Sequence, residues 1–366
     1  MMVRHEERIT TSETAVIITN FLLGTGILTL PRTSVDEVGT PDVWITLILG
    51  GLIALLAAII MVKLSHQYPD KTFYEYNQDI IGKWIGSLIS LFFVSYLLAH
   101  SGFQVRSMLE IIRFFLLEGT PRWAIVMIFL WVGLYLIVGG LSSIARLFQI
   151  VLPITFILFL LVVFMGIGIF DVDNMRPVLG KGIGPVLKGI KVTALSFSGI
   201  EIILILMPFM YQPRKAIHTV VIGIAIPLLF YMITVVMVIG ALSIDGVVSR
   251  TWPTIDLMRS FEIPGLIFER FESLLLVIWI MQLFSNFTIS YFAAAVGLSQ
   301  LLKRRMEPIL FGLLPVIYLI AMTPKNINQL FQMGDLIGNS AIFLVGLIPL
   351  MLLVISKVRR RKFEKN

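Results

Sequence analysis

Long apolar runs, nearly free of charged residues, recur along the whole chain. About 20 such residues are what a helix needs to cross the roughly 30 Å hydrocarbon core of a membrane. Backbone amide and carbonyl groups must pair within each segment there, so the runs are predicted to be helices rather than strands. Ten spans are expected, at 14–31, 43–62, 84–105, 123–145, 147–170, 192–213, 219–244, 273–302, 308–324 and 336–356.

The ten spans predict one all-α membrane domain over residues 14–356. A polar segment, 1–13, precedes it, and a basic tail, 357–366, follows it. Lys and Arg concentrate in alternate loops, on the same side as both ends of the chain, so both termini are expected in the cytoplasm. Short amphipathic surface helices are expected between spans, at 72–83, 251–262 and 326–333, the first of them opened by a capping box.

Composition narrows the class of protein further. Of the 366 residues 57% are hydrophobic and only 14% are charged, which excludes a water-soluble globule. The net charge of +7 comes from basic residues in short loops and in the tail, a pattern typical of contact with anionic lipid rather than nucleic acid. The chain has no Cys, and its four His have no metal-ligand spacing, so no metal, cofactor or enzymatic activity is expected.

Two segments break the uniformity expected of a spanning helix. Both combine glycine with small polar residues and have a proline downstream, Pro31 or Pro208; the segments are Gly24-Thr25-Gly26-Ile27 in span one and Ser196-Phe197-Ser198-Gly199-Ile200-Glu201 in span six. These spans begin two units of five, 14–170 and 192–356, and because five is odd the second unit enters from the opposite face. The pattern predicts a 5+5 inverted repeat with broken helices one and six. The alternative is that the glycines serve only close helix packing.

A broken helix frees backbone groups that need partners. The N–H groups that open the second half of span one would attract a carboxylate, and carbonyls near the break in span six would accept hydrogen bonds from an ammonium group. A zwitterionic amino acid fits both.

Polar side chains in other spans complete the candidate site. Ser101 and Gln104 lie in span three, where Gln104 shares a helix face with His100, and Asn286 and Thr288 lie in span eight. Arg106 and Glu110 are expected to form an ion pair near the outer interface instead. Glu201 falls close to the middle of span six, so it is protonated, paired or facing a water-filled cavity. Contact with a ligand amine or with water is favoured for Glu201 over a bond to a neighbouring helix.

The break in span one, Gly24-Thr25-Gly26-Ile27-Leu28 with Pro31, resembles the broken first helix of the amino acid, polyamine and organocation permease superfamily, whose members have the LeuT-type fold. More narrowly, the chain resembles the endospore germination permease family, the B subunits of bacterial spore germinant receptors. The stretches that carry this resemblance are Ile9-Thr10-Thr11, Gly24 to Arg32, Thr72-Phe73-Tyr74-Glu75-Tyr76 with Ile81-Gly82-Lys83, and Gly199 to Pro208.

The resemblance implies a nutrient sensor in the spore inner membrane that works with an A subunit and a C lipoprotein subunit. It also implies that Thr25, Gly26 and Ile27 receive the carboxylate of an amino acid, and that Phe197, Ser198 and Gly199 meet its amino group. The main hypothesis is a receptor subunit that binds a small germinant, and the alternative is a proton- or sodium-coupled amino acid permease. The full set of candidate ligand residues is Gly24, Thr25, Gly26, Ile27, Ser101, Gln104, Phe197, Ser198, Gly199, Glu201, Asn286 and Thr288.

Overall fold

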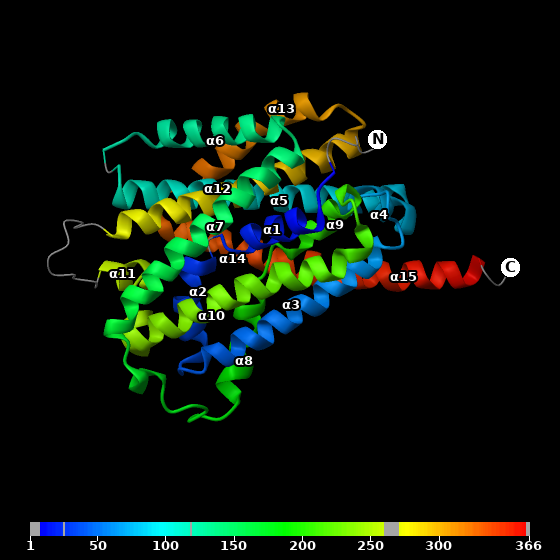
Figure 1. Cartoon of the computed structure of the whole chain (residues 1–366). Helices are drawn as coiled ribbons and strands as arrows, with labels where there is room; N and C mark the ends of the chain where they lie inside the picture. The colour runs from blue at the N-terminus through cyan, green and yellow to red at the C-terminus, as the bar shows by residue number, and fades with distance from the viewer. Residues whose placement is uncertain (1–7, 25, 118, 260–270, 364–366) are drawn as a thin grey trace.

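The computed structural model describes residues 8–24, 26–117, 119–259 and 271–363 (Figure 1). In these ranges the regular structure is helical, and extended pairing is limited to one isolated bridge between Ile9 and Met210. The first half contains α1 (Thr11–Leu22), α2 (Gly26–Val38), α3 (Val43–Ser65), α4 (Phe73–Ile81), α5 (Lys83–Phe115), α6 (Arg122–Val138) and α7 (Leu141–Gly166). The second half contains α8 (Gly184–Leu195), α9 (Ile203–Leu206), α10 (Ala216–Val248), α11 (Pro253–Arg259), α12 (Phe271–Leu302), α13 (Met306–Met322), α14 (Ile327–Ala341) and α15 (Ile348–Phe363).

Six helical segments are long and apolar enough to cross a membrane by themselves. They are α3, α5, α7, α10, α12 and the continuous run of α14 and α15. The segments 184–195 and 200–209 pass the same test as a pair bent by 42°, and α6 and α13 are shorter apolar helices. The protein is therefore an integral membrane protein, while the count of ten spans stays a prediction.

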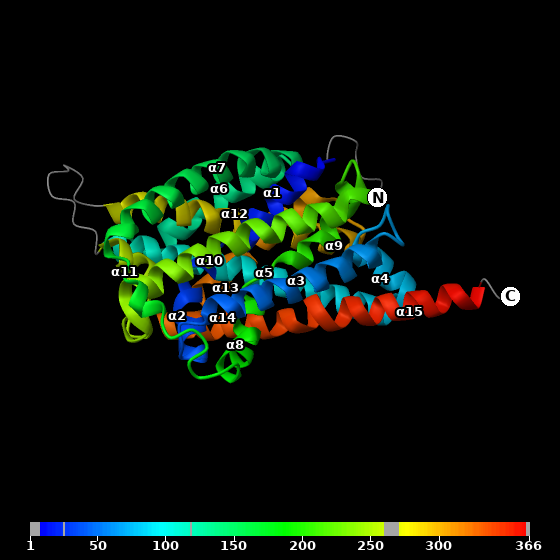
Figure 2. The ribbon, with the colours of Figure 1, turned by 60° about the horizontal axis from the view of Figure 1, so that its bottom comes forward.

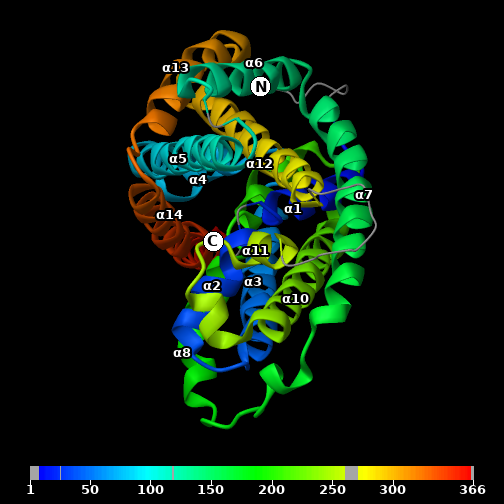
Figure 3. The same cartoon turned by 90° about the vertical axis from the view of Figure 1, so that its left-hand side faces the viewer.

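The helices form an elongated bundle around α1 (Figures 1 and 2). In the view along the bundle, α1 lies between α7, α10 and α12, and α5 runs beside α12 (Figure 3). On the other side of α1, α3 packs against both α8 and α10. The central position of α1 brings its C-terminal end to the middle of the molecule, where the candidate site lies.

Close approach of α3 to α8 depends on Gly50. A methyl group added at Gly50 would come within 2.7 Å of Thr193 Oγ1 and 2.8 Å of the Ala194 backbone nitrogen. At the same contact, the Thr193 hydroxyl donates to the Thr46 carbonyl at 2.8 Å. The pair is thus held by backbone proximity and a hydrogen bond across the helices, as is common between membrane helices.

The predicted capping box at α4 is confirmed. The Thr72 N–H donates to Glu75 Oε2 at 3.1 Å, which pairs a backbone donor that precedes the first turn. The helix is then fastened to its neighbours: the Tyr74 hydroxyl donates to the Ala293 carbonyl at 3.1 Å, and Asn77 Nδ2 donates to the Gly86 carbonyl at 2.8 Å. Helix α4 therefore ties the ends of α5 and α12 together.

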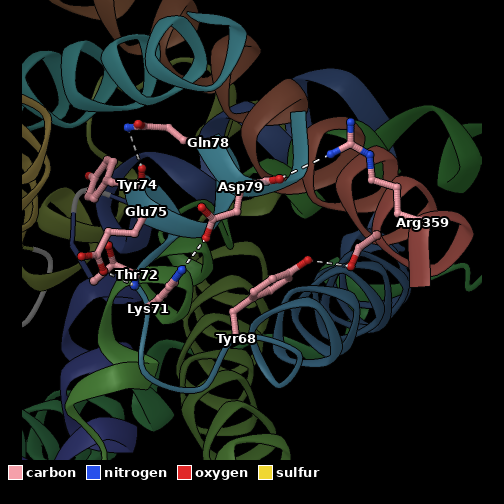
Figure 4. A network of polar contacts seen from close by, with 9 residues as sticks. Tyr68, Lys71, Thr72, Tyr74, Glu75, Gln78, Asp79 and Arg359 are labelled. Carbon is pink, nitrogen blue, oxygen red and sulfur yellow. Dashed lines mark hydrogen bonds and ion pairs between the residues drawn. The ribbon is translucent and has the colours of Figure 1, made fainter. Parts of the chain in front are cut away.

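A polar network joins α4 to α15 at the same end of the bundle (Figure 4). Tyr68 and Ser356 share a hydrogen bond of 3.0 Å, and Arg359 Nη1 donates to the Asp79 carbonyl at 3.4 Å. Lys71 pairs with Asp79 at 2.7 Å, and this hydrogen bond raises the pKa of Lys71 above its usual value. Because the Lys71–Asp79 pair is half-exposed, it adds little stability, and the buried contacts of Tyr68 and Ser356 fix α15 instead.

Two boundaries differ from the sequence prediction. The predicted spans 123–145 and 147–170 are expected to be separated by Gly139, Gly140 and Arg146. The break lies at the two glycines, because Gly140 has a φ of 81° and interrupts the helix there, and Arg146 lies inside α7. Segment 326–333, predicted as a separate surface helix, is the first part of α14, whose Gly334 packs against Phe103 of α5. Of the predicted helix 251–262, α11 covers Pro253–Arg259, and residues 260–262 lie outside the described residues.

The Gly50 contact gives a test of the packing. We expect Gly50→Ala to lower the thermal unfolding temperature of the full-length protein in detergent, because overpacking a tight contact costs about 1–3 kcal/mol. Gly312→Ala in α13 is the matched control, since nothing lies within 4 Å of the added methyl group. Equal unfolding temperatures for the two variants would contradict the assigned contact.

Candidate functional site

Helix α1 ends beside the first glycine cluster. Its last residue is Leu22, and the N–H of Leu23 bonds to the Thr19 carbonyl at 3.0 Å before α2 begins at Gly26. Thr25, a predicted ligand residue, lies outside the described residues, and so does the side chain of the predicted ligand residue Ile27. Leu23 and Gly24 therefore lie outside helix between the end of α1 and the start of α2, in the centre of the bundle.

Helix α8 ends beside the second glycine cluster. It stops at Leu195, and short 3₁₀ turns lead through Ser198 to the 3₁₀ segment that starts at Ile200. Gly199 has a φ of 121°, a conformation that side chains disfavour. The half-buried Ser198 donates its N–H to the Leu195 carbonyl at 2.9 Å, so this turn is paired within itself.

The two interruptions lie against each other. A methyl group added at Gly199 would come within 2.9 Å of Phe21 Cδ1 and 3.4 Å of Leu22 Cδ2. The end of α1 thus packs directly on the turn that follows α8. Glycine is required at residue 199 both for its backbone angle and for this contact.

Tyr231 of α10 connects both interruptions. Its buried hydroxyl donates to the carbonyl of Leu22, the last residue of α1, and lies 3.3 Å from the carbonyl of Ser196, just after α8. Its ring makes an edge contact with the predicted ligand residue Phe197, with centroids 5.5 Å apart. A methyl group at Gly26 would come within 2.8 Å of the hydroxyl oxygen. Sequence reasoning missed Tyr231, because a tyrosine in an apolar run has the same pattern as a core aromatic.

Glu201 is fully buried and bonded on both oxygens. Oε1 accepts a hydrogen bond from the Tyr96 hydroxyl of α5 at 2.6 Å, and Oε2 accepts one from the Gly199 N–H at 2.7 Å. The carboxylate therefore pairs a backbone donor freed by the break and ties this segment to α5. Of the alternatives open from sequence, the bond to a neighbouring helix is present, and contact with a ligand amine or water stays a prediction.

The polar residues predicted on α5 and α12 come together beside α1. Gln104 Nε2 lies 3.2 Å from His100 Nε2 and 3.5 Å from Asn286 Oδ1. Asn286 Nδ2 in turn donates to the Asn20 carbonyl at 2.9 Å, and a methyl group at Gly24 would come within 2.7 Å of the Asn286 side chain. Gly24, Gln104 and Asn286 thus form one wall of the first interruption.

Two predicted residues bond to helix backbone instead. The Ser101 hydroxyl donates to the Phe287 carbonyl at 3.4 Å, and the Thr288 hydroxyl lies 3.0 Å from the carbonyls of its own helix at Phe284 and Ser285. Both side chains are fully buried. Ser101 thereby fastens α5 to α12, while Thr288 bonds within α12.

The ion pair expected on α5 is present. Arg106 Nη2 lies 2.6 Å from Glu110 Oε1, and the arginine side chain is almost fully buried. In the described ranges, no group of three or more His, Asp or Glu residues could hold a metal ion.

A second set of polar contacts links α1 to the wall of a small apolar cavity. Gln282 Nε2 donates to Asn20 Oδ1 at 3.1 Å and to the Thr155 hydroxyl at 2.8 Å, while the buried Oε1 of Gln282 has no partner. The cavity has a volume of about 40 Å³, roughly three times what one water needs. Its lining contains none of the twelve predicted ligand residues and consists of Leu23, Thr155, Phe159, Val162, Val163, Phe230, Thr234, Met237, Val238, Thr254, Leu257, Ile278, Trp279 and Gln282.

The pairing of Glu201 can be tested by stability. Glu201→Ala leaves a buried N–H and a buried hydroxyl without an acceptor, so we expect it to destabilise the protein by about 2–4 kcal/mol. Tyr96→Phe removes only one donor and is expected to cost clearly less. Thermal unfolding of the purified full-length variants measures both, and equal losses would contradict the two-donor arrangement.

Comparison with known proteins adds sequence and fold relatives. Residues 8–330 match the family described as spore germination protein. The spore germination protein YndE of Bacillus subtilis (strain 168) is 56% identical over 97% of this chain and 98% of its own length. Spore germination protein A2 of the same organism is 39% identical over 94% of each chain.

Solved structures share the fold at low sequence identity. MhsT in complex with L-phenylalanine aligns with a TM-score of 0.68 at 11% identity, covering 96% of this chain and 99% of that one. A Na⁺-coupled sialic acid symporter aligns with a TM-score of 0.69 at 12% identity, covering 94% and 79%. The arrangement is therefore that of LeuT-type transporters. On its sequence, the chain belongs to the spore germination protein family of permease-like membrane subunits.

Proposed function

We propose that this protein is the nutrient-sensing subunit of a spore germinant receptor, which binds a small germinant, an amino acid, between its two helix interruptions. The observation that carries the proposal is the contact between them: the end of α1, with Leu22, packs on the turn at Gly199. Backbone groups freed at membrane depth are binding groups for small polar solutes. Membership in the germination family supports the sensing role.

The proposal includes ten spans in two inverted units, 14–170 and 192–356. In it α1 with α2, and α8 with residues 200–209, are the broken spans one and six, and the short α6 and α13 are spans four and nine. The start of α1 and the end of α15 lie at the same end of the bundle, which suits an even number of spans (Figures 1 and 2). The basic tail beyond α15 favours the cytoplasm for that end.

The ligand is proposed to lie with its carboxylate at the start of α2, against Thr25, Gly26 and Ile27. The N-terminus of a helix offers unpaired N–H groups and positive dipole charge to such an anion. Its ammonium group is proposed to meet carbonyls next to Phe197, Ser198 and Gly199. The fold likeness to MhsT, whose structure holds L-phenylalanine, supports an amino acid as the ligand class.

The remaining candidate residues are proposed to surround the ligand. Gly24, Gln104 and Asn286 form the wall on the α12 side, with Ser101 and Thr288 behind them. Glu201 is proposed to respond to the ligand amine through the turn at Gly199, which its carboxylate holds.

Receptor partners follow from the family rather than from geometry. We propose that the protein works with the A and C subunits of a germinant receptor, and that it lies in the spore inner membrane. The ligand acts by binding one of two conformations of the membrane bundle more tightly, and the partners respond to the shift.

A coupled amino acid permease is the second candidate, because the fold is shared with a Na⁺-coupled symporter. In such transporters, carbonyls at the ends of broken helices coordinate the coupling cation. Here the Asn20 and Leu22 carbonyls at the end of α1 accept hydrogen bonds from Asn286 and Tyr231. The donor that Asn286 holds at the Asn20 carbonyl favours the sensor over a sodium-coupled permease.

A binding experiment tests the proposed site. Purified full-length protein, screened by thermal shift against the common L-amino acids, is expected to be stabilised by at least one of them. Gly26→Leu should abolish that stabilisation, because the added side chain collides with Tyr231 and fills the proposed carboxylate position. Gly312→Leu, at an open helix surface, is the control and should keep binding. Undiminished stabilisation of Gly26→Leu would count against this site.

Liposome uptake separates the two functions. We expect the reconstituted chain alone to bind its amino acid without accumulating it, in sodium or in a proton gradient. Concentrative, ion-dependent uptake of the radiolabelled amino acid would overturn the sensor proposal in favour of the permease.

A further inference from the structure

The carbonyls at the two interruptions are not equally well paired. The Thr19 carbonyl bonds to the Leu23 N–H, and the Ala194 and Leu195 carbonyls bond to the N–H groups of Phe197 and Ser198. These bonds are local turns of the backbone. Each of these three carbonyls therefore already has a backbone donor.

Two carbonyls differ from these neighbours. Leu22 and Ser196 carry carbonyls that, among the described contacts, are reached by the Tyr231 hydroxyl. One hydroxyl has one proton, so it satisfies one of the two acceptors at a time. The two carbonyls therefore share the single proton of Tyr231 inside the bundle, where a carbonyl without a donor is costly.

A primary ammonium group matches this pair better than the hydroxyl does. It carries three donors and a positive charge, and hydrogen bonds from charged donors are the stronger ones. It can bond to both carbonyls at once. The requirement is that the hydroxyl leaves, because the same space cannot hold both groups.

We propose that the Tyr231 hydroxyl occupies the binding position of the ligand's ammonium group, and that the ammonium displaces it from the Leu22 and Ser196 carbonyls. This rests on the proposed function and assigns to its ligand a free primary ammonium. Tyr231 also lies against Gly26, where the carboxylate is proposed to bind, so its hydroxyl closes the site from both sides.

Displacement gives binding a mechanical consequence. Tyr231 lies on α10, and its ring packs on Phe197 beside the second interruption. When the hydroxyl leaves the two carbonyls, the bond from α10 to α1 is lost while the Asn286 bond from α12 to α1 remains. Ligand binding thereby removes the hydrogen bond that holds α10 to the end of α1, while the packing of Gly223 on Ile18 remains, and α10 is the element that reports occupancy.

Tyr231→Phe is the direct test, since it removes the competing hydroxyl and keeps the ring. We expect the panel amino acid that stabilises the wild-type protein to bind the variant about five- to tenfold more tightly, because the ligand no longer replaces an existing hydrogen bond. The N-acetyl derivative of the same amino acid lacks the ammonium and should gain nothing. Affinities are measured by thermal shift and by equilibrium binding on the full-length protein.

Tyr291→Phe is the matched control. Tyr291 is equally buried, and its hydroxyl also donates to a leucine carbonyl, that of Leu310, but the contact joins α12 to α13. Both variants should lose stability to a similar degree, and only Tyr231→Phe should gain ligand affinity.

A second measurement covers the case in which Tyr231→Phe does not fold. With 3-fluorotyrosine at residue 231 of the full-length protein, the ¹⁹F resonance should shift when the amino acid is added, and the same label at residue 291 should not. An unshifted signal at saturating amino acid would overturn the proposal.

The outcomes separate this inference from the proposed function. Wild-type binding with equal or weaker affinity in Tyr231→Phe overturns the displacement and leaves the sensor intact. If no amino acid stabilises either protein, the amino acid sensor itself fails, and the displacement fails with it.

Discussion

Backbone polar groups inside hydrocarbon must find partners, and the centre of this protein is organised by that requirement. In a continuous helix the chain satisfies it locally. Where α1 ends at Leu22 and α8 ends at Leu195, local turns satisfy part of this requirement, and side chains supply further donors and acceptors. Glu201 accepts from the freed Gly199 N–H, Asn286 donates to the Asn20 carbonyl, and Tyr231 donates to carbonyls on both sides.

These partners differ in how replaceable they are. The Asn286 amide is itself held by Gln104 and by the carbonyl of Gln282, and Glu201 has donors on both oxygens. Breaking either contact would leave several buried groups unpaired at once, so they behave as fixed parts of the bundle. Tyr231 is the exception, because its single proton is divided between two acceptors. A small polar ligand can therefore compete for its place without dismantling the surrounding network.

Much of this centre could be predicted from sequence, for physical reasons that are visible in particular residues. Gly24, Gly26 and Gly199 stand out in apolar runs because a residue without Cβ tolerates close approach and unusual backbone angles, and each of them meets a neighbouring side chain within 3 Å of an added methyl group. Glu201 stands out because a carboxylate at membrane depth needs partners. His100 and Gln104 stand out as polar residues four positions apart in one span, and Asn286 stands out in another span that is dense in polar residues.

What could not be predicted depends on contacts between distant segments. Tyr231 has no sequence signal, since its role comes from meeting Leu22 and Ser196, over 200 and 35 positions away. Between α6 and α7 the sequence offers Gly139, Gly140 and Arg146 as the boundary, and the choice among them depends on the positive φ of Gly140, since Arg146 lies within α7. The start of α14 reads as polar, yet it continues an apolar span because Gly334 allows it to pack on α5.

The contacts of α1 with α7, α10 and α12 differ, and this difference determines which helix can respond to a bound ligand. Helix α1 is tied to α12 through Asn286, which is proposed to line the ligand site, and to α7 through Asn20, which donates to the Phe148 carbonyl. Helix α10 packs on α1 where Gly223 meets Ile18, and it also bonds to α1 through the Tyr231 hydroxyl, whose place the ligand's ammonium is proposed to take. A ligand that displaces this hydroxyl changes a hydrogen bond from α10 while those made by Asn286 and Asn20 persist, and a conformational equilibrium can be shifted only through such a difference. Because α10 also packs on α3, a change at this one hydrogen bond can reach the opposite side of the bundle while α1, α7 and α12 stay together.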